Sequence, residues 1–141
     1  MKYLVCVDGS QSSLKAVKYA IKLASDNRSS SSIVLINVHD DEPLNRVKSF
    51  VGKREVENFL IENSKIELKA AQKLLNTSKI KHSIIIELGH IASTIASTAS
   101  TEKCDMIILG AKGRTGIVDL LLGSVAQRVG AIAKQPVLLV K

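Results

Sequence analysis

The sequence predicts a single α/β domain built on a doubly wound, five-stranded parallel sheet in the order 3-2-1-4-5. Short runs of β-branched and other apolar residues alternate with stretches of helical periodicity, in the order βαβαβαβαβ. These runs are apolar throughout, which is typical of parallel strands covered by helices on both faces. The 141 residues suit one domain, which we expect to span residues 1–141.

The first predicted elements follow in a regular order. Residues 3–7 form an apolar run that stops before Asp8, so we expect a buried strand followed by a turn. A helix follows, because Ser10 is a favourable N-cap and apolar residues recur at spacings of three and four up to about Asp26. Residues 33–38 are a continuous β-branched and leucine run and form the second predicted strand.

The region from residue 42 to about residue 53 breaks this pattern. It contains Pro43 and Gly52 and shows no clear period, so we expect an irregular connection. A long amphipathic helix follows over residues 54–76, with apolar inward positions and interleaved Glu and Lys.

The second half of the chain alternates between apolar runs and periodic segments, interrupted by one stretch with four glycines. The expected elements are a strand at 83–88, a helix from 91 to about 102, a strand at 106–109, a glycine-rich loop at 110–123, a helix from 124 to about 134 and a strand at 137–140.

Composition and residue order exclude several classes of protein. No charge-free apolar run approaches the roughly 20 residues that a membrane span needs, so we expect no membrane partner. Asp8 comes too early for the apolar core of a signal peptide, and we expect a cytoplasmic protein. Cys6 and Cys104 lie in or beside apolar runs and are predicted to be buried thiols rather than a redox pair or zinc ligands.

The net charge of +7 keeps nucleic acid open as an alternative partner. Nine basic residues oppose four acidic ones between Arg46 and Lys81, and we attribute most of this surplus to the long second helix. Aromatic residues make up only 3% of the chain, too few for the stacking platforms of single-strand binders. A solvated basic face is therefore favoured, and nucleic-acid binding is not expected.

A ligand site is expected where the winding of the sheet reverses. Strands one and four are neighbours there, and ligands bind outside the carboxyl ends of such strands. Asp8 follows strand one, and its carboxylate can bind a ribose hydroxyl or a metal ion. Gly110 follows strand four, and glycine can adopt positive φ and lets the backbone approach a ligand closely.

The end of the glycine-rich segment suits a phosphate. Gly123 and Ser124 open a helix, whose N-terminus favours an anion, and Lys112 and Arg114 add cations nearby. Neither G-x-x-x-x-G-K-[ST] nor a G-x-G-x-x-G after the first strand is present, which tells against P-loop ATPases and dinucleotide-binding proteins.

Other interpretations of these polar residues stay open. Asp8 could cap the first helix together with Ser10. The acidic residues after His39 are better explained as a solvated turn than as a metal cluster. No residue stands out as a catalytic base, so we predict no catalytic residue and no protein-held metal site.

The glycine spacing resembles the ATP-binding signature of the universal stress protein family, G-x2-G-x9-G-[ST]. Gly110, Gly113, Gly123 and Ser124 occupy its four fixed positions, and the surrounding residues agree over essentially the whole chain. The resemblance implies a Rossmann-like fold of the adenine nucleotide α-hydrolase-like type. It also implies a regulatory stress-response module that binds ATP together with Mg²⁺ or Mn²⁺.

The resemblance further implies roles for individual residues. The acid after strand one contacts the ribose, the backbone at the end of strand two contacts adenine, and the signature residues line the ribose and phosphates. Ala126 stands where the family often has a hydroxyl, and it has none to offer a phosphate. Together with the cation Arg114, the expected cofactor-binding residues are Asp8, Val38, Gly110, Gly113, Arg114, Gly123, Ser124 and Val125.

The last strand, residues 137–140, is expected to mediate a homodimer. It lies at the edge of the predicted sheet, where an uncovered apolar strand invites pairing. The resemblance implies antiparallel pairing of these strands across a two-fold axis. Two alternative functions remain, a slow ATP-hydrolysing switch and a nucleic-acid-associated stress protein that uses the basic second helix.

Overall fold

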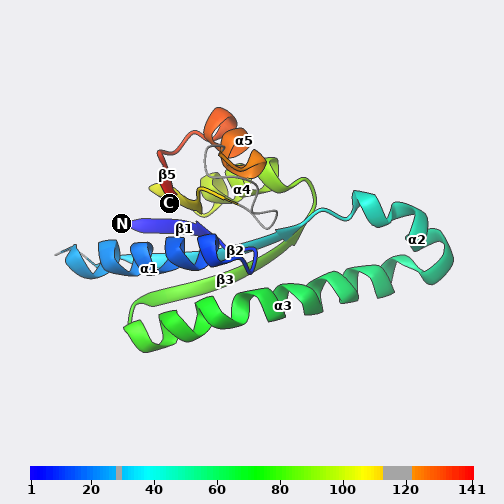
Figure 1. Cartoon of the computed structure of the whole chain (residues 1–141), viewed down its shortest axis with the longest axis horizontal. Coiled ribbons are helices and arrows are strands. Elements are labelled where there is room, and N and C mark those ends of the chain that lie inside the picture. The colour runs from blue at the N-terminus through cyan, green and yellow to red at the C-terminus, as the bar shows by residue number, and fades with distance from the viewer. Residues whose placement is uncertain (28–29, 113–121) are drawn as a thin grey trace.

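The computed structural model describes residues 1–27, 30–112 and 122–141. It shows a five-stranded sheet between two layers of helices (Figure 1). The strand order is β3-β2-β1-β4-β5 and all neighbouring pairs are parallel, which confirms the predicted doubly wound 3-2-1-4-5 sheet. The strands are β1 (Lys2–Cys6), β2 (Ser32–His39), β3 (Lys81–Leu88), β4 (Met106–Gly110) and β5 (Val137–Val140).

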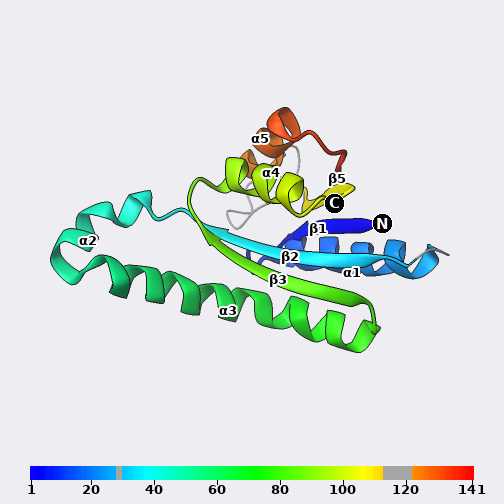
Figure 2. The same cartoon turned by 180° about the vertical axis from the view of Figure 1, so that it is seen from behind.

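The helices divide between the two faces of the sheet (Figures 1 and 2). α1 (Gln11–Asp26) and α3 (Lys53–Ser78) cover one face, and α4 (Ile91–Thr101) and α5 (Ser124–Ile132) cover the other. These helices and all five strands begin and end within two residues of the predicted positions. Of the helices in the described part of the chain, none is both long and apolar enough to cross a bilayer.

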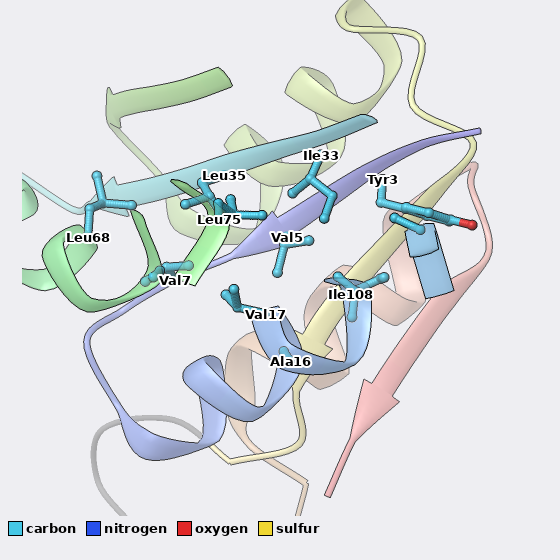
Figure 3. Close-up of a cluster of buried hydrophobic side chains, with 13 residues drawn as sticks. Tyr3, Val5, Val7, Ala16, Val17, Ile33, Leu35, Leu68, Leu75 and Ile108 are labelled. Atoms are coloured by element: carbon cyan, nitrogen blue, oxygen red, sulfur yellow. The ribbon is translucent and has the colours of Figure 1, made fainter. Parts of the chain in front are cut away.

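Each face of the sheet buries its own cluster of apolar side chains. β1 turns Val5 toward α1 and α3, and its neighbour Leu4 toward α4 and α5. On the α1 and α3 side, Val5, Val17 and Leu75 are completely buried (Figure 3). Burying a side chain of this size contributes about 1.5–3 kcal/mol. The two clusters explain why the central strands β1 and β4 are apolar over most of their length.

The expected irregular connection at residues 42–53 is wrong, because this region is helical. A 3₁₀ turn (Glu42–Leu44) leads into α2 (Asn45–Val51), and Gly52, with a φ of 101°, separates α2 from α3. Pro43 lies in the first turn of the 3₁₀ helix, where its missing N–H costs no hydrogen bond. α2 projects beyond the sheet and buries no residue, so no core-facing pattern marks it in the sequence (Figures 1 and 2).

An ion pair fixes the entry to α2. Lys48 Nζ donates a hydrogen bond to Asp41 Oδ2. This hydrogen bond holds the pKa of Asp41 below its ordinary value, against a smaller opposing effect of desolvation. The carboxylate is therefore charged at neutral pH and holds the segment after β2 to α2.

The basic surplus is not concentrated on the long second helix. α3 contains five basic and four acidic residues, so it is nearly neutral. The other basic residues of this region lie on α2, on β3 and at Lys79 between α3 and β3. The expectation that most of the basic surplus lies on this helix is therefore wrong, because the surplus is spread over α2, α3, Lys79 and β3.

Gly110 lies where α1 packs closely against the end of β4. A Cβ built on Gly110 would lie 2.4 Å from Ser12 Oγ and 2.6 Å from the Ser12 carbonyl carbon, closer than non-bonded atoms can approach. The Lys112 N–H donates to Ser12 Oγ at 3.2 Å across the same contact. Among the described residues Gly110 is not one of the positive-φ glycines. Close packing between α1 and β4 therefore explains this glycine.

Gly110→Ala should destabilise the fold by about 1–3 kcal/mol, because the added methyl group must push the backbone of α1 away from β4. Urea denaturation measures the change. Gly130→Ala is the matched control, since Gly130 is in α5 and a Cβ there meets nothing within 4 Å. The control should be stabilised by about 0.5–1 kcal/mol. Equal stability of Gly110→Ala and the unmodified protein would contradict the packing explanation.

Candidate functional site

A cleft of about 270 Å³ opens at the carboxyl ends of β1 and β4, where the order of the sheet reverses. Its described lining comes from the carboxyl-terminal parts of β1, β2 and β4 and from the N-terminal parts of α1, α4 and α5. Gly113 and Arg114 lie outside the described residues. The other predicted site residues all line this cleft: Asp8, Val38, Gly110, Gly123, Ser124 and Val125.

Asp8 shapes the turn that leaves β1. Its Oδ1 accepts a hydrogen bond from the Ser10 N–H at 2.9 Å, and its own N–H donates to Ser13 Oγ at 3.4 Å. Ser10 is the N-cap of α1, as predicted, because its Oγ accepts from the Ser13 N–H at 3.1 Å. Asp8 therefore supports the cap of α1 and also lines the cleft.

The N-terminus of α5 forms another wall of the cleft. Gly123 precedes α5 with φ −59° and ψ 148°, values that any residue adopts, so its backbone does not use the positive φ that glycine allows. The Gly123 N–H donates to Ala111 O at 2.9 Å, which ties the start of α5 to the segment after β4. Among the residues that the structure describes, no side chain caps α5. The positive end of its dipole and its first N–H groups are therefore suited to an anion.

Cys6 is not fully buried, contrary to expectation. It lies at the end of β1, is partly exposed and lines the cleft. Desolvation raises the pKa of the Cys6 thiol, and the nearby charge of Asp8 raises it further. The thiol is therefore protonated at neutral pH and forms a neutral part of the wall. Cys104 is buried, as predicted.

Sequence reasoning missed a polar network beside the cleft. Asn37 is only 1% exposed, and its Nδ2 donates to Val7 O at 2.8 Å and to Glu67 Oε2 at 2.7 Å. His39 Nε2 lies 3.1 Å from the same carboxylate oxygen. The asparagine within the otherwise apolar run of β2 is the sequence feature that could have indicated this network. Glu67 comes from α3, and no local spacing links it to β2.

Glu67 also contacts the turn after β1. A Cβ built on Gly9, which has a φ of 81°, would lie 3.0 Å from Glu67 Cγ. Glu67 thus packs against the turn that contains Asp8 and binds the end of β2 that contains Val38. In the described part of the chain, no group of three or more His, Cys, Asp or Glu side chains is arranged to hold a metal ion.

A family model and similar curated proteins both point to one family. The model described as the universal stress protein family matches residues 1–141. The universal stress protein MJ0531 of Methanocaldococcus jannaschii is 34% identical over 141 residues, which cover 99% of this chain and 81% of the relative.

Solved structures show the same fold. The structure of MJ0577, a universal stress protein of M. jannaschii, has a TM-score of 0.86 at 31% identity and covers 99% of this chain and 94% of that one. A universal stress protein family member from Arabidopsis thaliana, solved with AMP bound, has a TM-score of 0.68 at 16% identity and covers 100% and 91% of the two chains. At this low identity the two proteins are similar in fold. This chain belongs to the universal stress protein family.

Proposed function

We propose that this protein binds ATP in the cleft at the ends of β1 and β4 and acts as a regulatory module in a stress response. The observation that supports this most strongly is the convergence of three features on one cleft. These are the Asp8 turn after β1, the segment after β4 that begins at Gly110, and the uncapped N-terminus of α5. Ligands of doubly wound sheets bind at this position.

Each part of the nucleotide has a partner in the cleft. Adenine contacts the backbone of Val38, and the carboxylate of Asp8 accepts hydrogen bonds from the ribose hydroxyls. A carboxylate can accept about four hydrogen bonds, so the bond from the Ser10 N–H does not by itself exclude a bond from the ribose. The AMP-bound member from A. thaliana supports an adenine nucleotide in this fold.

The phosphates lie at the start of α5. The N–H of Val125 and the hydroxyl of Ser124 donate to phosphate oxygens, and the helix dipole stabilises their charge. Ala126 lines the cleft and provides no hydroxyl there. Gly113 and Arg114 lie outside the described residues. We include Gly113 among the nucleotide-binding residues because it occupies a fixed position of the signature, and Arg114 because its positive charge suits a phosphate.

Mg²⁺ or Mn²⁺ fits this site as an ion carried by the nucleotide. The described residues contain no cluster of three acidic, His or Cys side chains that could hold it alone. Mg²⁺ usually keeps several water ligands and binds phosphates together with one or two carboxylates, a role open to Asp8. When bound, the ion would neutralise phosphate charge.

The proposal also places a homodimer contact on β5. Within the described parts of the chain this strand pairs with β4 alone, and all its residues are half-buried. Ile107 N–H donates to Pro136 O, and Ala111 N–H donates to Val140 O. Because backbone groups alternate sides along a strand, the N–H of Leu139 points to the open edge, where the β5 strand of a second copy in the cytoplasm can pair with it.

ATP with Mg²⁺ should raise the melting temperature of nucleotide-free protein by several degrees. A ligand that binds only the native state adds about 2.7 kcal/mol at about 100 times its Kd. Differential scanning fluorimetry measures the shift. Inorganic tripolyphosphate is the control for phosphate charge without adenosine and should give a smaller shift. No shift at millimolar ATP would refute the proposed function.

Gly123→Val should weaken ATP binding by at least about tenfold, because the side chain occupies the approach to the start of α5. The φ and ψ of Gly123 suit valine, so the fold should be retained. Isothermal titration calorimetry measures the Kd, and circular dichroism checks the fold. Unchanged affinity in a folded variant would place the phosphates elsewhere.

Leu139→Pro should convert the homodimer to a monomer, because proline removes an N–H that faces the open edge while the bonds of β5 to β4 remain. Leu139→Ala is the matched control, since it shortens the side chain and keeps the N–H. Light scattering measures the mass of both variants. An unmodified protein that is monomeric at tens of micromolar would refute the dimer.

A further inference from the structure

His39 lies at the proposed adenine end of the cleft. It follows Val38 directly, and both residues line the cleft. Its side chain is only 11% exposed, and its Nε2 lies 3.1 Å from Oε2 of Glu67. The imidazole is therefore held at one ring nitrogen by a carboxylate from α3.

The contacts of Glu67 define which nitrogen of His39 bears a proton. Asn37 Nδ2 donates both to Val7 O, which can only accept, and to Glu67 Oε2. The amide group of Asn37 thus has its N–H groups toward Glu67, and Oε2 acts as an acceptor. A carboxylate has no proton to donate, so His39 Nε2 must be the N–H donor in this contact. In the neutral ring, Nδ1 is then an acceptor.

We propose that His39 selects adenine over guanine in this cleft and that Glu67 is the positioning residue that fixes its tautomer. This inference rests on the proposed nucleotide-binding function. Adenine has an exocyclic amino group, a donor that matches the Nδ1 lone pair, whereas guanine has the acceptor O6 at the same place. A site that presents an acceptor therefore favours ATP and disfavours GTP.

The preference for ATP over GTP should weaken as the pH falls. When His39 is protonated, both ring nitrogens are donors, so the match to the adenine amino group is lost and guanine O6 becomes acceptable. Selectivity for ATP is therefore full while His39 is neutral, at high pH, and falls when the ring is protonated at lower pH. Glu67 contacts the His39 ring directly. Other ionisable groups line the same cleft or lie on adjoining segments of the described chain: Cys6, Asp8, Asp40, Asp41 with its partner Lys48, Glu87, His90 and Lys112.

The ratio of the GTP Kd to the ATP Kd isolates this effect. The phosphates of the two nucleotides titrate alike, and the other groups around His39 act on both, so their influence largely cancels in the ratio. Calorimetry with Mg²⁺ at about pH 5.5, 6.5 and 8 gives the ratio for the unmodified protein. We expect it to be about tenfold larger at the highest pH than at the lowest, corresponding to one hydrogen bond gained or lost.

Two variants and one control test the roles of the two residues. His39→Phe keeps a planar ring without nitrogen and should give a low ratio that does not change with pH. Glu67→Gln should lower the ratio at high pH, because the amide can donate to Nε2 and release the other tautomer. Glu62→Gln removes an equal charge from an exposed part of the same helix and should leave the ratio unchanged. Melting temperatures without ligand check that each variant folds.

The outcomes separate this inference from the proposed function. Binding of both nucleotides to the unmodified protein with a pH-independent ratio overturns the role of His39 and leaves the nucleotide site intact. Failure of both nucleotides to bind overturns the proposed function and the inference together. A folded Glu67→Gln variant with an unchanged ratio overturns the positioning role of Glu67. The unmodified protein tests the selection by His39 even if both variants fail to fold.

Discussion

The close approach of α1 to the end of β4 is the constraint on which the cleft depends. There is no room for a Cβ at Gly110, because Ser12 in the first turn of α1 lies against it. Beyond this contact, Ala111 donates to Val140 O and accepts from the Gly123 N–H. One short segment therefore connects α1, β5 and the start of α5, so the walls of the cleft are set by packing before any ligand is present.

Most of the fold could be predicted because burial on both faces leaves a strong signal in a parallel strand. Val5 and Leu4 enter different clusters, so β1 is apolar on both of its faces. Such strands alternate along the chain with helices of clear period. The same reasoning failed at α2, which buries nothing. The Asp41–Lys48 pair holds α2 to the segment after β2, and this contact leaves no periodic signal directed at the core.

The candidate site could be predicted where its residues lie at the ends of strands, because topology brings those ends together. Asp8, Val38 and Gly110 line the cleft for this reason. The structural role of each of these glycines could not be predicted. Gly110 makes room for α1, and Gly123 has an ordinary φ. Glu67 was missed because its contact with His39 depends on how α3 packs across β2, which only the folded chain defines.

The central claim is that the cleft holds ATP, and the most direct measurement is mass spectrometry of the small molecules released when freshly purified protein is denatured. The protein should be purified without added nucleotide and in the presence of Mg²⁺. The account predicts that ATP is released in an amount approaching that of the protein, and that Gly123→Val releases much less. Stoichiometric release of a ligand without adenine, displaced from the same cleft in Gly123→Val, would contradict it.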